Sequence, residues 1–408
     1  MAPLELTRRE FTRALGLGLA PMLSGLAPAI SALAPPVAAR GREERLGLGG
    51  RVLRVKRKPK DPADLILLNS NENPYGPSPA ALEAMVAAHE VACRYPDYWA
   101  YELQERLAAF HGVSQEMVEV TCGSTEVLKV AAQAFAGPGR RLVLADPTFE
   151  AIAHYAETAG GEVIKVPLDA HYRHDLDAMA AAARAQPGLL YLCNPNNPTG
   201  TVVSHQAVAQ LLAQVPAETV VLVDEAYHHY VESPDYASAL DSVLAGHPGV
   251  IVSRTFSKIY GMAGLRLGYA LAHEELIEKM RPHQVLESWN VMACVAALAS
   301  LEDTELVPRG RARNKQARDY VRGEMKRRGY STLPSETNFM MIDLGQEVTP
   351  VIEAFREQGI AVGRLFPSLP QHLRLSIGKP EEMEKFVEAF DQILPAPRFS
   401  AGPAVRAA

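Results

Sequence analysis

The chain has 408 residues, of which 48% are hydrophobic and 22% charged, as in an ordinary globular protein. With roughly 150 residues per domain as a guide, this length predicts about two folded domains. The formal net charge of −6 at pH 7 argues against a large basic surface, so we expect no nucleic-acid partner.

The pattern of the N-terminal residues predicts a signal for export. Residues 7–13 are TRREFTR, with twin arginines at Arg8 and Arg9, and a run rich in Ala, Gly and Leu follows. Residues 1–39 thus resemble a twin-arginine signal peptide, which predicts a periplasmic protein, with a signal-anchor, a disordered tail and a cytoplasmic location as alternatives. Glycines and prolines interrupt the run, so we expect no permanent membrane span. Residues 40–64 are basic and are predicted to be a linker.

The middle of the chain alternates short apolar runs with segments of helical periodicity. Residues 149–160 and 204–216 place apolar side chains three and four positions apart and predict helices. The runs that predict buried strands are 142–146, 162–168, 189–195, 219–227, 250–256 and 266–272. This alternation predicts an α/β fold with a mostly parallel central sheet flanked by helices, whose ligands bind at the carboxyl ends of the strands.

The pattern changes after about residue 300. A long charged helical segment at 308–329 precedes the apolar runs at 335–344 and 373–378, which predicts a smaller α+β domain. The predicted organisation is an N-terminal arm that joins the small domain (65–98), a large domain (99–300), a small domain (301–395) and a disordered tail (396–408).

The four cysteines do not predict a metal site. Cys93, Cys122, Cys193 and Cys294 form no C-x-x-C pair and no cluster with histidines at metal-binding spacing. We interpret them as small buried side chains, with a disulfide left open because the signal predicts an oxidising compartment.

Polar motifs follow two of the predicted strands. VVLVDEAYHHY carries Asp224 to a strand end with Tyr227 three positions later, although Asp at such a junction can also cap a helix. NPNNPTG at 194–200 also follows an apolar run and can equally form a plain tight turn.

Two further motifs suit an anion. In VTCGSTEVLKVAAQAF, Gly123, Ser124 and Thr125 open an amphipathic helix whose first N–H groups can hold an anion, or whose hydroxyls can serve as ordinary caps. In SRTFSKIYGMAGLRLGYA, Lys258 is preceded by hydroxyl residues and followed by Arg266. Hydroxyls and a guanidinium suit a phosphate, and a desolvated lysine can attack a carbonyl, whereas a lone lysine is usually a surface residue.

Together with NENPYG (71–76), RYPD (94–97), DPTFE (146–150) and LRLSIG (373–378), these motifs carry a family resemblance over residues 65–395. The chain resembles the class I/II aminotransferases of the fold-type I pyridoxal-phosphate enzymes, particularly the histidinol-phosphate aminotransferase branch. The resemblance implies transfer of an amino group between an amino acid, or a histidinol phosphate-like amine, and a 2-oxo acid. A decarboxylase or lyase of the same fold, like threonine-phosphate decarboxylase, is the alternative.

The resemblance also implies roles in holding pyridoxal 5′-phosphate. Lys258 would form the Schiff base and shuttle a proton, Asp224 would pair with the ring nitrogen, and Tyr227 would bind the ring oxygen. The other implied cofactor residues are Asn197 at the ring oxygen, Phe149 on the ring face, Gly123, Ser124, Thr125, Thr255, Ser257 and Arg266 at the phosphate, and Tyr95. Because Tyr95 would reach the phosphate of a neighbouring subunit, a homodimer is implied.

Substrate recognition is implied for three residues. Arg374 in LRLSIG would bind the acidic group of the substrate, and Tyr75 and Asn338 match pocket positions. Arg364 is a second candidate, but the family reads Val-Arg where this chain has Val-Gly-Arg, so Gly363 departs from the family pattern.

Overall fold

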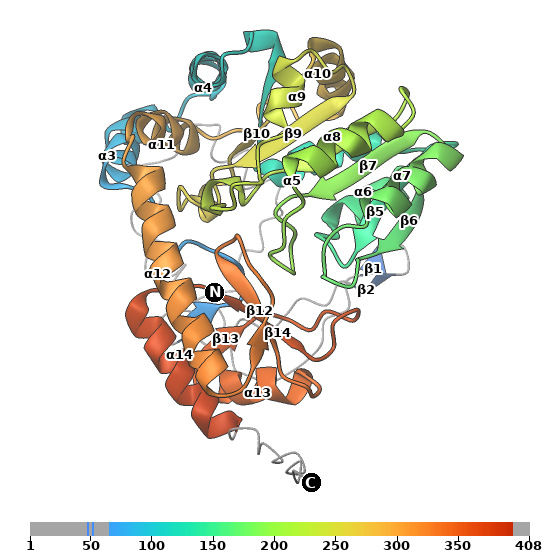
Figure 1. Ribbon diagram of the computed structural model, residues 1–408. Helices are drawn as coiled ribbons and strands as arrows, with labels where there is room; N and C mark the ends of the chain where they lie inside the picture. Colours follow the sequence, from blue (N-terminus) through green and yellow to red (C-terminus); the bar gives the residue numbers. More distant parts are fainter. Residues whose placement is uncertain (1–46, 49–50, 53–64, 395–408) are drawn as a thin grey trace, which may run out of the picture. The chain divides into compact units, whose positions relative to one another are not determined.

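The structure is a computed structural model that describes residues 47–48, 51–52 and 65–394 (Figure 1). The chain divides into two compact units, residues 1–59 and 60–408. In the first unit, strands β1 (Gly47–Leu48) and β2 (Arg51–Val52) pair antiparallel. The predicted signal peptide (1–39), most of the predicted linker (40–64) and the predicted tail (396–408) lie outside the described residues.

A seven-stranded sheet forms the large part of the second unit. Its order is β4-β10-β9-β8-β7-β5-β6, and the strands from β9 to β6 run parallel. The strand bounds are β4 (Val118–Thr121), β5 (Arg141–Asp146), β6 (Glu162–Pro167), β7 (Gly188–Cys193), β8 (Val220–Asp224), β9 (Val250–Thr255) and β10 (Gly268–Ala272). The predicted mostly parallel sheet is confirmed. β10, however, is antiparallel to β4 and β9 and begins after Arg266, whose left-handed backbone (φ 55°) ends the preceding loop.

Helices cover both faces of this sheet, because its central strands are apolar on both sides. Along β7, Leu190 and Leu192 pack into one core cluster, whereas Leu189 and Tyr191 pack into the other. On the first face lie α4 (Asp97–His111), α7 (Leu176–Ala185), α8 (His205–Gln214), α9 (Leu240–Leu244) and α11 (Val291–Glu302), with α3 (Pro79–Ala87) packed against α11. On the second face lie α5 (Ser124–Phe135), α6 (Ala151–Thr158) and α10 (Glu274–Met280). The two faces of the sheet are therefore covered, whereas the ends of its strands are left free to form a binding site.

The smaller part is built on two short sheets. β12 (Phe339–Asp343) pairs antiparallel with β11 (Ser331–Thr332) and β14 (His372–Ser376), and β13 (Ile360–Val362) pairs parallel with β3 (Ile66–Leu68). Helices α12 (Leu306–Arg327), α13 (Thr349–Glu357) and α14 (Pro380–Ile393) pack with them around one apolar core. The pairing of β3 with β13 brings residues 66–68, at the start of the second unit's described residues, into the smaller part.

Short 3-10 helices occupy several connections. They are η3 (Ala88–Val91), η4 (Gln115–Met117), η5 (His228–Tyr230), η6 (Ala263–Leu265) and η7 (Arg281–His283). Among the described helices, none has the length and apolarity needed to cross a bilayer.

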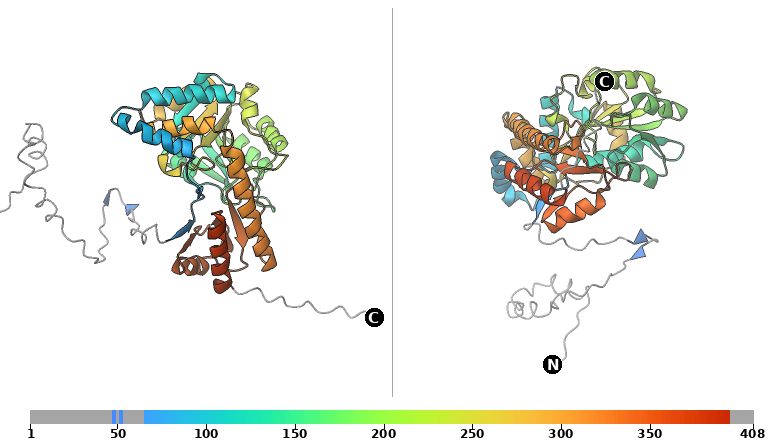
Figure 2. Two further views of the ribbon diagram at one scale, coloured as in Figure 1. Left: turned by 90° about the vertical axis from the view of Figure 1, so that its left-hand side faces the viewer. Right: turned by 60° about the horizontal axis from the view of Figure 1, so that its bottom comes forward.

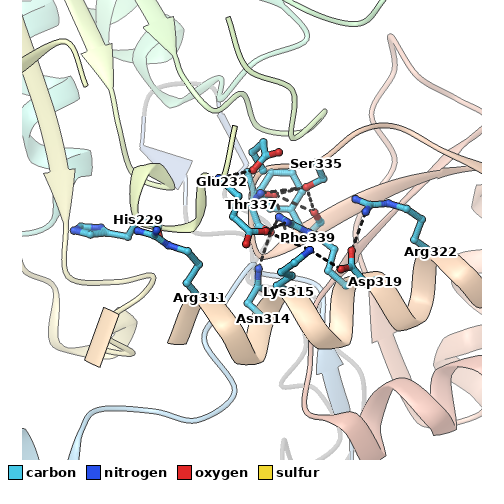
Figure 3. A network of polar contacts seen from close by, with 12 residues as sticks. His229, Glu232, Arg311, Asn314, Lys315, Asp319, Arg322, Ser335, Thr337 and Phe339 are labelled. Carbon is cyan, nitrogen blue, oxygen red and sulfur yellow. Dashed lines mark hydrogen bonds and ion pairs between the residues drawn. The ribbon is translucent and has the colours of Figure 1, made fainter. Parts of the chain in front are cut away.

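The long helix α12 connects the two parts, as the side view in Figure 2 shows. Its Arg318 donates to Oε2 of Glu232, in the loop after η5, and to the Thr337 carbonyl, before β12, at 3.2 and 3.1 Å. Nε of Arg311 donates to the His229 carbonyl at 2.9 Å (Figure 3). These bonds fix the chain that follows β8 to the segment that leads into the small antiparallel sheet.

Candidate active site

A cavity of about 400 Å³ lies where the large sheet's strand ends meet the small sheet. Its walls include most of the residues that the sequence singles out, although these lie far apart along the chain. They are Ser124, Thr125, Phe149, Asn197, Asp224, Tyr227, Thr255, Ser257, Lys258, Arg266, Arg364 and Arg374.

Asp224 ends strand β8 and is 3% exposed. Its Oδ2 accepts a 2.9 Å hydrogen bond from the Tyr191 hydroxyl, and its Oδ1 accepts a 3.1 Å bond from the Ala226 N–H. Burial raises the pKa of Asp224 to about 6, although both hydrogen bonds favour the ionised form. A cationic partner in the cavity would therefore be strongly attracted to this carboxylate.

Lys258 follows strand β9, and its amine points to the segment after β3. Nζ donates to the Asn71 carbonyl at 3.0 Å and lies 5.4 Å from the centre of the Tyr227 ring. Burial, and next the charge of Arg374, lowers the pKa of Lys258 to about 8. The amine is thus closer to its neutral, nucleophilic form at physiological pH than a surface lysine.

Tyr227 is buried, and its hydroxyl accepts a 3.1 Å hydrogen bond from Nδ2 of Asn71. Burial raises the pKa of Tyr227, so the phenol keeps its proton and can donate it into the cavity. Asn71 adopts a left-handed backbone (φ 55°), and Ser376 of β14 binds both its N–H and its side-chain oxygen, at 2.8 and 3.2 Å. The segment after β3, which contains Asn71, is therefore part of the site.

The start of helix α5 and the loop after β9 form one cluster of donors. Ser257 binds Oγ1 of Thr255 through its N–H at 3.1 Å and accepts a 3.3 Å hydrogen bond from Nη1 of Arg266. Gly123 precedes α5 with φ +78°, and a Cβ at this position would lie 2.3 Å from Nη2 of Arg266. Glycine thus allows the guanidinium to lie directly against the helix start, which is a favourable position for an anion.

Arg374 enters the cavity from strand β14 and is 8% exposed. Its Nη1 donates to Oδ1 of Asn197 at 2.8 Å, and its Nη2 donates to the Asn69 carbonyl at 2.7 Å. Its Nε is buried and has no hydrogen-bond partner among the described residues. Burial lowers the pKa of Arg374 to about 10, which leaves it charged at neutral pH. It faces neutral protein partners and can accept an anionic ligand.

Four residues expected at the site lie outside this cavity's lining: Gly123, which precedes α5 beside Arg266, and three others. Tyr95 is 75% exposed between η3 and α4. Tyr75 lines a separate pocket and stacks with Arg313, 4.7 Å from the ring centre. Asn338 is buried behind the cavity, where its amide donates to the Asn71 and Glu72 carbonyls at 3.0 and 3.2 Å.

Sequence reasoning missed several residues of the site. Tyr191 lies in an apolar strand run that does not reveal its hydrogen bond to Asp224. The cavity also contains Ser70, Asn71, Glu72, Thr148, Cys193 and Phe366. NENPYG could have indicated Asn71, because asparagine is one of the few residues that readily adopts a positive φ.

The described residues offer neither a disulfide nor a metal site. All four cysteines are free. Cys193 and Cys294 are buried, as predicted, but the prediction is wrong for Cys93, which is exposed after η3, and Cys122 is only half-buried. No group of three or more His, Cys, Asp or Glu side chains within residues 65–394 could hold a metal ion.

The donor set of the cavity fits pyridoxal 5′-phosphate. A guanidinium, hydroxyls and a helix start suit its phosphate. Because residue 123 is a glycine, the Arg266 guanidinium occupies the space that a side chain at position 123 would take. A buried carboxylate suits a protonated ring nitrogen, and an amine with a lowered pKa suits an aldehyde.

Comparison with known proteins agrees with this reading. The sequence profile of the family described as aminotransferase class I and II matches residues 63–390. A histidinol-phosphate aminotransferase of Moorella thermoacetica is 42% identical over 335 residues, which cover 81% of this chain and 86% of that protein. One of Symbiobacterium thermophilum is 41% identical and covers 81% and 91%. The crystal structure of the Sinorhizobium meliloti histidinol-phosphate aminotransferase with pyridoxal-5′-phosphate has a TM-score of 0.76 and 25% identity, covering 81% and 90%.

The fold and the site together define a fold-type I pyridoxal-phosphate enzyme. The chain belongs to the class I and II aminotransferase family, and its activity is that of a pyridoxal-phosphate-dependent aminotransferase.

Proposed function

We propose that this aminotransferase accepts primary amines that carry an anionic group, a carboxylate or a phosphate monoester, bound by Arg374. The observation that carries the proposal is the buried guanidinium of Arg374, whose Nε is unpaired among the described residues and which shares its cavity with Lys258. An arginine fork binds either anion. Histidinol phosphate, which the relatives' names specify, and ordinary amino acids both belong to this class, with a 2-oxo acid as acceptor.

We propose roles for the residues nearest the chemistry. When bound, pyridoxal phosphate supplies an electron sink that makes the proton on Cα of the substrate amine removable. Lys258 holds the cofactor and, once free, moves that proton as a base, for which its lowered pKa is suited. Asp224 keeps the ring nitrogen protonated through its buried negative charge.

Hydrogen bonds that are already in place support two of the other cofactor contacts that we propose. Oδ1 of Asn197 is engaged by Arg374, so its NH₂ group remains to donate to the ring oxygen, as does the phenol of Tyr227. Phe149 covers one ring face. The phosphate is held by Gly123, Ser124, Thr125, Thr255, Ser257 and Arg266.

A panel of amines tests the proposed substrate class. The cofactor-loaded enzyme is mixed with single amines without acceptor, and conversion to pyridoxamine phosphate is followed by absorbance. Histidinol phosphate and amino acids should react, whereas histidinol and tyramine, which lack an acidic group, should react at least about tenfold more slowly. Equal rates for the amines without an acidic group would contradict the proposal, and release of CO₂ without pyridoxamine phosphate would indicate the decarboxylase alternative.

We also propose that the enzyme is a homodimer in which Tyr95 reaches the partner's cofactor phosphate. Supporting this, the chain at the start of α4 exposes Tyr95, Tyr98 and Tyr101 by 75%, 69% and 62%, an aromatic surface suited to an interface. Mixing Lys258→Ala and Tyr95→Ala subunits tests it. Hybrid dimers would carry one intact site and regain activity, whereas a mixture as inactive as its components would contradict a shared site.

Finally, we propose that residues 1–39 act as a twin-arginine signal that exports the folded enzyme. The support is the sequence pattern around Arg8 and Arg9, which lies outside the described residues.

A further inference from the structure

Arg364 and Glu150 form an ion pair between the two parts of the second unit. Arg364 follows β13, and Glu150 directly precedes α6. Nη2 of Arg364 lies 2.6 Å from Oε1 of Glu150, and the two side chains are 52% and 69% exposed. Because Arg364 also lines the catalytic cavity, this pair stands at its solvent-exposed side.

The Glu150 carboxylate is not needed by its own helix. Glu150 occupies the N-cap position of α6, where Ser, Thr, Asp or Asn commonly accepts from a backbone N–H, but its side chain makes no such bond. Its side chain instead meets Arg364, which also stacks on Phe366 with 4.4 Å between guanidinium carbon and ring centre. The carboxylate is thus committed to neutralising an arginine of the cavity wall.

Gly363, which precedes Arg364, packs directly against the backbone of Arg374. A Cβ at position 363 would lie 2.6 Å from the Arg374 carbonyl oxygen, so only glycine fits against strand β14 there. Phe366 lies beside both guanidinium groups, 5.1 Å from that of Arg374, and is 4% exposed. An aromatic ring therefore adjoins both cations, and the arginine fork of Arg364 is turned toward Glu150.

Two arginines of the cavity wall, Arg364 and Arg374, differ in whether their charge is neutralised. The Arg374 guanidinium contacts only neutral partners, a side-chain amide and a carbonyl, whereas Arg364 is already paired. Glu72, which also lines the cavity, adds a further negative charge. The other charged residues of the wall, Asp224, Lys258 and Arg266, serve the cofactor under the proposed function. Among these described wall residues, Arg374 is therefore the cation that has neither an ion-pair partner nor a proposed role at the cofactor, and it remains for the substrate.

We propose that Glu150 is a specificity residue that neutralises Arg364, so that the site favours amines with one carboxylate and an apolar or aromatic remainder over dicarboxylates and phosphate monoesters. The inference rests on the proposed function and narrows it, because it selects the carboxylate among the anions that Arg374 could bind. It places the apolar remainder of the substrate beside Phe366.

Succinate and succinamate test the proposal, because they have the same length and differ in one negative charge. Calorimetric titration of the cofactor-loaded enzyme measures the Kd of each. We expect Glu150→Gln to tighten succinate relative to succinamate by roughly fivefold, the scale of an exposed ion pair. Glu162→Gln is the matched control, since it removes an exposed glutamate paired with Arg141 at 2.9 Å outside the cavity lining and should leave the ratio unchanged.

The variants separate two kinds of failure. An unchanged ratio in Glu150→Gln, or an equal change in Glu162→Gln, would overturn the role of Glu150 alone. With Arg364→Gln as background, Glu150→Gln should have no further effect, and a full effect there would also overturn it. If neither probe binds the wild-type enzyme, or if Arg374→Gln leaves both affinities unchanged, the anion site itself is refuted and the proposed function fails.

Discussion

Nη1 of Arg374 donates a 2.8 Å hydrogen bond to Oδ1 of Asn197, although the two residues are 177 positions apart. Asn197 follows strand β7 of the large sheet, and Arg374 lies in β14 of the small sheet. The residue proposed to recognise the substrate is thus oriented by a residue proposed to contact the cofactor ring. Substrate and cofactor sites are built as one hydrogen-bonded assembly.

Arg374→Gln should raise the KM for acid-bearing amines by about 10- to 100-fold, the value of a hydrogen bond to a charged group. Cofactor retention should remain near normal, because the phosphate cluster is left intact. Steady-state kinetics with an amino acid donor measures the effect. Arg356→Gln, an exposed arginine of α13, is the control, and equal KM values in the two variants would exclude Arg374 as the anion site.

Lys258→Ala should lower turnover by about 10³-fold or more, because it removes both the covalent attachment and the proton carrier. Borohydride treatment followed by peptide mass mapping should place a pyridoxyl group on Lys258 in the wild type and nowhere in the variant. Turnover that persists in the variant, or an adduct on another lysine, would refute the assignment.

Tyr191→Phe should shift the acidic limb of the kcat/KM profile upward by about one pH unit. The Asp224 carboxyl works in its ionised form, which is populated above its pKa; burial raises that pKa and the Tyr191 hydrogen bond lowers it. Loss of the Tyr191 hydroxyl therefore raises the pKa of Asp224 further. When the pH is lowered, the variant should lose activity at a higher pH than the wild type. Tyr230→Phe, at a buried tyrosine, is the control and should leave the limb in place.

Gly123→Ala should weaken cofactor binding more than Gly139→Ala does, even though both variants should lose stability through backbone strain. Gly123 and Gly139 both have positive φ, so alanine at either position strains the backbone by roughly 1–3 kcal/mol. Only at position 123 would the Cβ meet Arg266; at 139 nothing lies within 4 Å. Comparison of the cofactor Kd and the melting temperature in both variants separates the effects, and equal cofactor affinities would argue against the phosphate role of Arg266.

Replacement of Arg8 and Arg9 by lysine should retain the enzyme in the cytoplasm, because twin-arginine export depends on the arginine pair. Cell fractionation followed by an activity assay measures the distribution. Replacement of Arg40 and Arg42, in the predicted linker, is the matched control. Export that is unaffected by the Arg8 and Arg9 changes would refute the signal.

The sequence predicts those features of the site that depend on local pattern. Asp224, Asn197 and Lys258 follow apolar runs, so their place at strand ends could be inferred, and the helix that Gly123 precedes is amphipathic. The antiparallel direction of β10 could not be inferred in the same way, because an apolar run is the same in either direction.

The contacts that sequence does not reveal are those between distant segments. Asn71 meets Tyr227 and Ser376 only because β3 pairs with β13, and a three-residue strand carries little periodicity. The ion pair of Arg364 with Glu150 likewise depends on the placement of the small sheet beside the large one. The predicted domain boundaries, at 98, 300 and 395, remain predictions.

The hydrogen bonds between Asn71 and Ser376 also bear on the order in which the protein is made. Asn71 leaves the ribosome early, yet its side chain and N–H are held by a residue that is synthesised 305 positions later. The large sheet can form during translation, as domains generally fold in order of synthesis. The catalytic chamber, however, cannot close until translation is nearly finished, so capture of the vitamin-derived cofactor must be among the last events of maturation.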